Sequence, residues 1–449
     1  MKKRTFLKTT SALAAGAVIS RFVSCKPTAK KEHLKNWAGN LEYSTSNVHY
    51  PKTLEEVQDI VKNCDKLTAL GSQHSFNKIA DSTENQVSMK VMNKVVSLDK
   101  TANTVTIEAG MRYGDLAPYL HQNGYALHNL ASLPHITVAG SCATATHGSG
   151  LKNGNLSTGI SAIEFVNAAG EVVHLSRKVG EQFRGAVVGL GALGIVTKVT
   201  LDLLPTFNMK QYVYRNLPMS ALEKNFDAIE AMGYSVSLFT DWSNKNINEV
   251  WIKSKAEAGD TPPPAELFGA KLATKNMHPI EGQSAENCTE QMGVPGPWFE
   301  RMPHFKMGFK PSTGQEIQAE YFVPLEHAYE AIMAMETLQE KITPHLFISE
   351  IRTIDADDLW MSPCYKRKCV ALHTTWKFET DIVMGLLPLV EAQLAPFNAR
   401  PHWAKVFAMA PAVLDSRIEK LDDFKKLVAQ YDPKGKFRNE FLERNVFGG

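Results

Sequence analysis

The chain has 449 residues, of which 44% are hydrophobic and 21% charged, and its formal net charge is +2. The length predicts more than one hydrophobic core, and the composition is that of a soluble globular protein and not of a disordered one. Because positive and negative charges nearly balance, we expect neither nucleic acid nor an acidic macromolecule as a partner.

The N-terminus has the features of an export signal. Basic residues at 1–8 precede an apolar stretch at 11–20, which is too short to span a bilayer stably. We therefore expect residues 1–25 to be the signal and residues 26–36 to be a polar, basic tether.

Two details of this signal bear on where the mature protein resides. Lys3 and Arg4 resemble a twin-arginine signal with lysine in the first arginine position, which leaves the ordinary secretory route open. Residues 22–25 resemble a loose bacterial lipobox, in which Cys25 becomes the lipidated N-terminus; the alternative is a plain cleavage site near Cys25. The sequence predicts an exported bacterial protein, either periplasmic or lipid-anchored to the membrane.

The remaining cysteines do not form a disulfide or zinc pattern. An odd number without a CxxC pair argues against a disulfide framework and against a structural zinc site. Cys364 and Cys369 are close enough in sequence to pair in an oxidising compartment, but we favour free thiols. The five cysteines are Cys64, Cys142, Cys288, Cys364 and Cys369.

The first half of the mature chain mixes helices with strands. Residues 53–61 begin with a capping box and place their apolar side chains on one face, which predicts a helix. Strands are predicted at 95–98 and 104–109, and a helix at 112–122. This mixture predicts an α+β domain.

Residues 71–77, Gly-Ser-Gln-His-Ser-Phe-Asn, form a loop after a strand-like approach. Glycine lets the backbone come close to a ligand, and the hydroxyls and amides can donate hydrogen bonds to phosphate. The loop predicts an anion cradle that presents His74 as a nucleophile. The alternative is a Gly-Ser turn with an ordinary hydrogen-bonded histidine.

Residues 139–150 contain almost no large side chain. Such a run lets a ligand pack directly on the backbone, and its repeated Ser, Thr and Gly amides suit a pyrophosphate. A flexible linker is the alternative, but linkers do not usually carry the Pro-His and Ile-Thr-Val elements that precede this run. We therefore expect ligand binding here.

Residues 189–194 match the GxGxxG pattern of dinucleotide-binding folds. That fingerprint requires a helix that begins at the glycines. Residues 195–203 alternate and are β-branched, so they predict a strand instead. We therefore expect a tight turn or close packing beside a cofactor, and no Rossmann site.

From residue 209 onward the pattern predicts a second α+β region, with a long irregular stretch at 256–311. The chain ends in a charged helical segment at 414–447. The predicted strands are 211–215, 235–239, 320–323, 345–353 and 369–376, and the predicted helices are 222–232, 325–341 and 381–394.

Several long segments together resemble the bacterial alditol (xylitol) oxidases. The segments are GSQHSFN at 71–77, NLASLPHITVAGSCATATHGSG at 129–150, ENCTEQMGVPGPW at 286–298, ISEIRT at 348–353 and RPHWAKVF at 400–407. Those oxidases belong to the vanillyl-alcohol-oxidase group of flavoproteins, which includes the sugar-1,4-lactone oxidases. The resemblance covers nearly everything after the tether, in order.

The resemblance implies an α+β fold in three parts. These are a two-subdomain PCMH-type FAD-binding domain at 37–206, an α+β substrate-binding cap domain at 207–413 and a C-terminal segment, 414–449, that returns to the first domain. It also implies that His74 is joined covalently to the 8α-methyl group of FAD. Relatives with two covalent links have a cysteine in the loop matching 131–134, and none is present here, so we expect a single link. We expect a monomer.

The residues expected around FAD come from both glycine-rich segments, the start of the strand after residue 194 and the segment before Lys405. They are Gly71, Ser72, Gln73, His74, Ser75, Ser132, Thr137, Gly140, Thr144, Thr146, His147, Gly194, Ile195, Val196 and His402.

Oxidation of an alcohol to an aldehyde needs a hydride acceptor and a group that helps remove the hydroxyl proton. Strand alternation places Glu350 on one face with Arg352, and His373 on one face with Thr375. These groups and Lys405 suit a neutral polyhydroxylated substrate.

The family's substrate residues match Ser132, Glu350, Arg352, Thr375 and Lys405 in this sequence. We assign Lys405 and Arg352 to polarising the reacting hydroxyl, His373 to assisting proton removal, and the other three to holding the remaining hydroxyls. An internal Glu350–Arg352 pair and a surface Lys405 are the alternatives.

The expected function is FAD-dependent oxidation of the terminal primary alcohol of alditols such as xylitol or sorbitol, with hydride passing to flavin N5 and O2 reduced to H2O2. Two enzymatic alternatives remain, an aldonolactone or other sugar oxidase and a dehydrogenase that passes electrons to a respiratory acceptor. A non-enzymatic alternative is a surface lipoprotein that only binds sugars.

Overall fold

Strand pairing sorts the chain into two large and two small sheets. The computed structural model describes residues 33–178, 180–257, 259, 262–308 and 315–448, so the predicted signal and lipobox lie outside the described residues. One large sheet is antiparallel throughout, in the order β4-β5-β9-β7-β8. Its strands are β4 (Val95–Asp99), β5 (Thr104–Glu108), β9 (Ile195–Asp202), β7 (Ile160–Val166) and β8 (Val172–Ser176).

The first half of the chain also contains shorter helices and strands outside this sheet. Helix α1 (Leu54–Asn63) begins as predicted, because the Thr53 side chain accepts a hydrogen bond from the Glu56 amide at 3.2 Å. The parallel three-stranded sheet has the order β1-β3-β2. The remaining elements are β1 (Val48–His49), β2 (Thr68–Leu70), β3 (Gln86–Ser88), α2 (Tyr113–Gln122), β6 (Tyr125–Ala126), α3 (Val138–Ala143), α4 (Glu181–Val187) and β10 (Leu204–Pro205), of which β6 and β10 pair with each other.

The second large sheet has ten strands in the order β14-β15-β11-β13-β12-β18-β19-β17-β20, with β16 paired to β11. Its strands are β11 (Asn208–Pro218), β12 (Ser235–Thr240), β13 (Asn246–Lys255), β14 (Glu266–Leu267), β15 (Ala270–Leu272), β16 (Gly296–Pro297), β17 (Glu316–Pro324), β18 (Leu346–Ile354), β19 (Cys369–Lys377) and β20 (Arg400–Pro401).

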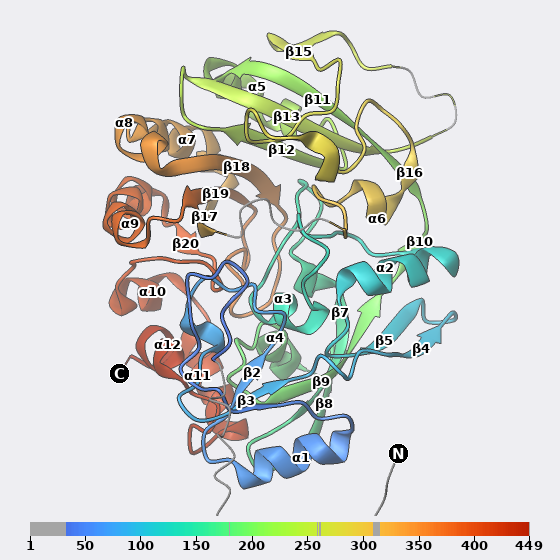
Figure 1. The fold of residues 1–449 in the computed structure, drawn as a ribbon, viewed down its shortest axis with the longest axis vertical. Helices are drawn as coiled ribbons and strands as arrows, with labels where there is room; N and C mark the ends of the chain where they lie inside the picture. The colour runs from blue at the N-terminus through green and yellow to red at the C-terminus, as the bar shows by residue number, and fades with distance from the viewer. Residues whose placement is uncertain (1–32, 179, 258, 260–261, 309–314, 449) are drawn as a thin grey trace, which may run out of the picture. The chain divides into compact units, whose positions relative to one another are not determined.

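Strand alternation gives the central strands of this sheet two different faces. Leu238, Ile351 and Leu372 pack in an apolar cluster with side chains of helices α5 (Leu222–Glu230), α7 (Ala328–Glu336) and α9 (Thr380–Leu394). Figure 1 draws α7 and α9 along one side of β17, β18 and β19. The alternate residues of the same strands therefore face away from these helices.

The C-terminal segment lies against the N-terminal elements. It contains α10 (Pro411–Arg417), α11 (Leu421–Tyr431), α12 (Glu440–Leu442) and a π-helical turn at Glu443–Phe447. The Asn439 side-chain amide donates to the carbonyls of Lys78, Ile79 and Asp81 at 2.9–3.2 Å. These bonds join the C-terminal segment to residues 78–81, which closely follow the loop at 71–77.

Most predicted elements are present, with four differences. Strands β7, β8 and β13 were not predicted. The predicted helix at 325–341 is divided into α7 and the short α8 (Gln339–Ile342), and the predicted helical segment at 414–447 is interrupted between α11 and α12. The supposed irregular region contains β14, β15, β16 and the short helix α6 (Trp298–Arg301).

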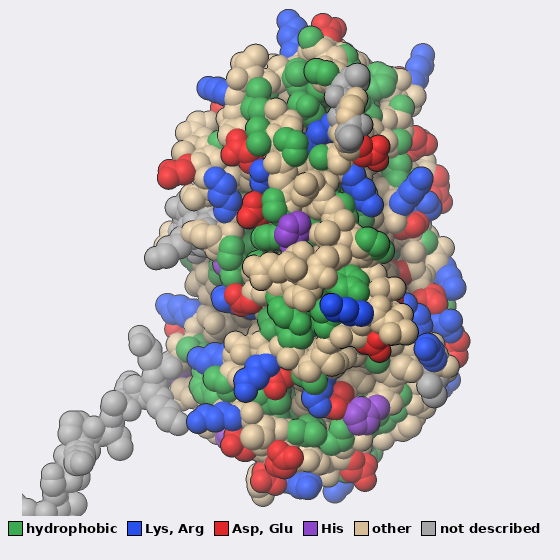
Figure 2. Space-filling model, turned by 90° about the vertical axis from the view of Figure 1, so that its right-hand side faces the viewer, with side chains coloured by type: hydrophobic (Ala, Val, Ile, Leu, Met, Phe, Trp, Pro, Cys, Tyr) green, Lys and Arg blue, Asp and Glu red, His purple; other side chains and the backbone are tan. Residues whose placement is uncertain are grey.

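Charges of both signs alternate over the face drawn in Figure 2, with no large area of one sign. This distribution agrees with the nearly balanced composition. The five cysteines in the described chain are free thiols, of which four are buried.

Candidate functional site

A cavity of about 770 Å³ extends from the loops at 71–76 and 131–147 to the polar face of the ten-stranded sheet. It brings together nearly all of the predicted site residues, which come from distant parts of the chain. The predicted residues that line it are Gly71, Ser72, Gln73, His74, Ser75, Ser132, Thr137, Gly140, Thr144, Thr146, His147, Val196, Glu350, Arg352, His373, Thr375, His402 and Lys405.

Gly194 and Ile195 do not line this cavity. Ile195 is fully buried in an apolar cluster, and a side chain at Gly194 would meet the Val166 carbonyl at 2.3 Å. Gly189 and Gly194 therefore serve close packing, whereas Gly191, with a φ of 78°, has no atom within 4 Å of an added Cβ and lines the cavity. Strand β9 follows these glycines directly, as expected from the sequence.

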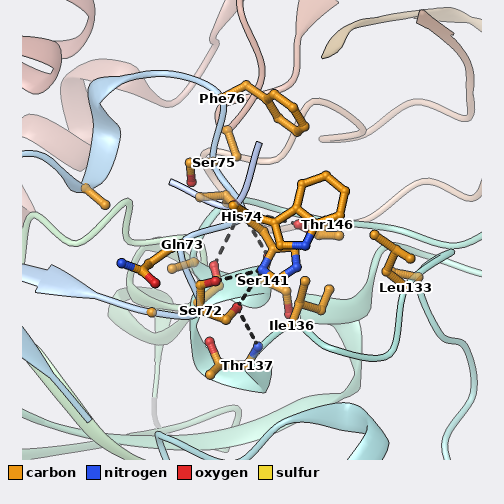
Figure 3. A pocket seen from close by; sticks show the side chains of 18 of the residues that line it. Ser72, Gln73, His74, Ser75, Phe76, Leu133, Ile136, Thr137, Ser141 and Thr146 are labelled. Atoms are coloured by element: carbon orange, nitrogen blue, oxygen red, sulfur yellow. Dashed lines mark hydrogen bonds between the residues drawn. The ribbon is translucent and has the colours of Figure 1, made fainter. Parts of the chain in front are cut away.

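The loop that carries His74 is fixed to the start of α3 by Ser72. The Ser72 hydroxyl accepts a hydrogen bond from the Thr137 amide at 3.1 Å, and His74 Nδ1 donates to the Ser72 carbonyl at 2.8 Å (Figure 3). Gln73 has a φ of 64°, so the loop bends through the left-handed region beside the histidine.

His74 has an unusual electrostatic setting. Burial lowers its pKa to about 4, so the imidazole is neutral near pH 7. Its ring stacks on Trp37 with 5.3 Å between ring centroids, and Nε2 is buried with no hydrogen-bond partner among the described residues. A neutral imidazole with a free nitrogen is suited to bond a ligand.

Two cavity-lining glycines, Gly71 and Gly140, let the loops that carry them approach each other beside Thr137. A Cβ atom added at Gly140 would lie 2.7 Å from Thr137 Oγ1, and one added at Gly71 would lie 3.1 Å from the same atom. The backbones of the two loops are therefore closer here than side chains allow. With the free nitrogen of His74, this cradle fits the phosphate-bearing FAD that the sequence predicts.

The other end of the cavity is a row of ionisable groups across three strands. His373 on β19 lies directly opposite Glu350 on β18 and opposite Glu320 on β17. Arg352 contacts both carboxylates, with Nη2 at 3.4 Å from Glu320 and Nε at 3.4 Å from Glu350, and Nη1 donates to Ser132 Oγ at 3.3 Å. The site thus connects the sheet to the loop at 131–134.

The charges in this row stabilise one another. Burial opposes ionisation of Glu350, but Arg352 and His304 outweigh it and hold its pKa below the usual range. Burial likewise opposes ionisation of Glu320, and His147, His373 and Arg352 hold its pKa well below normal. Both carboxyls are therefore ionised at neutral pH.

His373 and Lys405 differ in charge. Burial lowers the pKa of His373 to about 3, so its ring is neutral at neutral pH and one ring nitrogen has a lone pair that can accept a hydrogen bond. Burial lowers the pKa of Lys405 to about 8, which leaves an ammonium group at neutral pH. Lys405 Nζ donates to the Gln318 side chain and lies 4.8 Å from the centre of the Phe76 ring.

Sequence reasoning missed three groups in this site. His304 contacts Glu350 Oε1 at 2.6 Å, Glu320 accepts from His147 at 3.0 Å, and Gln318 binds Lys405. Gln318 and Glu320 are two residues apart on β17, so their side chains lie on the same face of the sheet. A predicted strand that began at 316 instead of 320 would have placed them together. His304 lies in an irregular segment, where no periodicity indicates its direction.

Comparisons with known proteins agree with this geometry. Residues 45–176 match the FAD binding domain family, and residues 310–445 match the D-arabinono-1,4-lactone oxidase family. The alditol oxidase of Streptomyces sp. is 44% identical over 92% of this chain and 99% of its own. The L-gulono-1,4-lactone dehydrogenase of Mycobacterium tuberculosis is 26% identical over 91% of this chain and 98% of its own.

Among solved structures, cholesterol oxidase from B. sterolicum superposes with a TM-score of 0.72 over 92% of this chain and 96% of its own, at 14% identity. This likeness confirms the predicted fold class, that of the FAD-binding oxidases. The domain boundaries at 206 and 413 and the predicted roles of individual residues remain predictions.

Proposed function

The chain belongs to the alditol oxidase family of FAD-dependent oxidoreductases, and we propose that it oxidises the terminal primary alcohol of a polyol such as xylitol or sorbitol to the aldose. The observation that carries this proposal is the buried row Glu320, His373 and Glu350, with Arg352 and Lys405 beside it, at one end of the cavity. Alternating acceptors and donors suit a neutral chain of hydroxyl groups.

When bound, FAD would supply the acceptor for the substrate's hydride, with O2 as the final electron acceptor and H2O2 as its product. Gly71, Gly140 and the hydroxyl-rich loops beside them would hold its phosphates. We propose that a ring nitrogen of His74 would be joined to its 8α-methyl carbon in place of one methyl hydrogen. That hydrogen and the imidazole N–H hydrogen would leave as protons, and the two electrons released would pass through the flavin to O2. The neutral imidazole with an unpaired Nε2, in a residue that lines the cavity, supports this bond.

Each polar group in the row has a proposed task. The ammonium of Lys405 and the guanidinium of Arg352 polarise the reacting hydroxyl and stabilise negative charge on its oxygen. A ring nitrogen of His373, neutral because of burial, accepts the hydroxyl proton. Glu350, Ser132 and Thr375 bind the remaining hydroxyls and so orient the reacting carbon.

A position outside the cytoplasm is proposed on the sequence of residues 1–25 alone. We also propose export, lipidation of Cys25 and a monomeric state.

The match of residues 310–445 to a lactone oxidase family makes an aldonolactone the second candidate substrate. Wild-type protein should be mixed anaerobically with xylitol, sorbitol and aldono-1,4-lactones while the flavin absorbance is followed. We expect the polyols to bleach the flavin and the lactones to leave it oxidised. Admitting air should then restore the colour, with H2O2 formed in equal amount to the aldehyde.

Other outcomes of this panel point to other functions. Bleaching by lactones alone would make the protein a sugar-lactone oxidase, and bleaching by neither would leave a sugar-binding protein. A flavin that stays reduced in air would show that another electron acceptor is required.

Replacement of Lys405 with Met should leave a yellow, folded protein but slow flavin reduction by xylitol by about 100-fold, because one donor to the developing alkoxide is lost. Stopped-flow absorbance measures this rate. Lys368→Met is the matched control, since Lys368 is exposed and pairs with Asp355 at 3.3 Å. Normal reduction by Lys405→Met would refute the role of Lys405.

Replacement of His74 with Ala should convert covalent FAD into FAD that acid precipitation extracts into the supernatant. His135→Ala is the control, because the His135 ring already donates a hydrogen bond to the Met307 carbonyl at 2.7 Å. The flavin of the His135→Ala variant should stay with the protein in the pellet. Flavin that remains attached in His74→Ala would show that another residue forms the bond.

A further inference from the structure

A buried lysine lies behind the wall of the cavity, two strands away from Glu350. Lys253 is on β13 and pairs with Ser235 on β12, while Ser237 on β12 pairs with Arg352 on β18. Paired residues, and residues two apart on one strand, have their side chains on the same face of a sheet. Lys253 therefore faces the same side of the sheet as Arg352 and Glu350. Its side chain is buried and does not line the cavity. Any effect of Lys253 on a substrate must therefore pass through other residues.

The Lys253 ammonium has three hydrogen-bond partners. Lys253 Nζ donates to the carbonyls of Met302 and Pro303 at 2.8 and 2.7 Å, and lies 3.2 Å from His304 Nδ1. An ammonium group has three hydrogens and no lone pair. Its third hydrogen is therefore directed at Nδ1, which accepts it.

This contact assigns the proton on His304. Because Nδ1 accepts from Lys253, the ring proton of neutral His304 is assigned to Nε2, which donates to Glu350 Oε1 at 2.6 Å. Burial lowers the pKa of His304 to about 4, which keeps the ring neutral. Burial lowers the pKa of Lys253 to about 7, against the attraction of Glu350, so the ammonium form prevails below pH 7 and is about half of the population at pH 7.

The surroundings hold the imidazole in this orientation. Phe239 and Trp251 pack edge-on against the His304 ring with centroids 5.5 and 5.3 Å away, and the His304 amide donates to the Ser132 carbonyl at 3.1 Å. The other ionisable groups facing Lys253 are Arg352 and Cys288, and burial raises the pKa of the Cys288 thiol to about 12. The contacts from Lys253 through His304 thus lead directly to Glu350.

Given the proposed function, we propose that Lys253 is a positioning residue for polyol recognition: through His304 it holds Glu350 as an ionised acceptor for a substrate hydroxyl. Oε1 of Glu350 is occupied by His304 and Arg352, whereas Oε2 has no hydrogen bond from the described residues. An ionised carboxylate only accepts hydrogen bonds. The site therefore selects a hydroxyl at this position of the substrate and rejects a carbonyl or a carboxylate there.

A double-mutant cycle on the flavin-loaded enzyme tests this path. Lys253→Met should raise the KM for xylitol about tenfold with little change in kcat, as expected for a lost hydrogen bond to a charged group. In a Glu350→Gln background the same substitution should change KM less than about twofold, because its target is already neutral. The control is Lys255→Met on the same strand, whose Nζ lies over Phe207 at 4.5 Å and should leave KM unchanged.

A pair of His304 variants provides a second, independent measurement if Lys253→Met does not fold. His304→Gln keeps an N–H that can reach Glu350, whereas His304→Leu removes it. We expect the KM of His304→Gln to lie nearer to the wild-type value than that of His304→Leu.

Equal KM effects of Lys253→Met in both backgrounds, no effect in the wild-type background, or equal KM values for the two His304 variants would overturn the inference. Failure of wild-type protein to oxidise any polyol would instead overturn the proposed function. The wild-type measurement thus separates the two failures.

Discussion

The site depends on mutual neutralisation of buried charges on one face of the ten-stranded sheet. Glu320 and Glu350 flank His373 on adjacent strands, and Arg352 contacts both carboxylates. Removal of either partner of such a buried pair leaves an uncompensated charge, at a cost of about 3–5 kcal/mol. The antiparallel register of β17, β19 and β18 is therefore as important to the site as the residues themselves. If one of these strands slipped by one residue against its neighbour, its polar side chains would point into the apolar cluster with α7 and α9.

The two ends of the cavity are also joined directly. The Asn77 side chain, three residues after His74, donates to the carbonyls of Trp403 and Lys405 at 2.8 and 2.7 Å. The Phe76 amide donates to the Ala404 carbonyl at 2.7 Å. The histidine proposed to carry FAD and the lysine proposed to polarise the substrate are thus held by one set of hydrogen bonds, which fixes the geometry on which the reaction depends.

Sequence reasoning predicted the parts of the site that follow from periodicity or from whole motifs. The alternation of side chains along a strand predicted that Glu350 and Arg352 lie on the same face. The glycine pattern at 189–194 precedes a strand and not a helix, which excluded a Rossmann site. Parity does not say which strands become neighbours, so the pairing of His373 with Glu320 was not predictable. His304 and Lys253 were missed for a related reason, because one lies in an irregular segment and the other in β13, a strand that was not predicted.

The most direct test of this account is the structure of the flavin-loaded enzyme with a polyol bound under anaerobic conditions. We expect the hydroxyl groups of the polyol to lie within hydrogen-bond distance of Glu350 Oε2, Arg352 and Lys405. A polyol ordered elsewhere in the cavity, with the row of charged groups bonded only to protein, would contradict it.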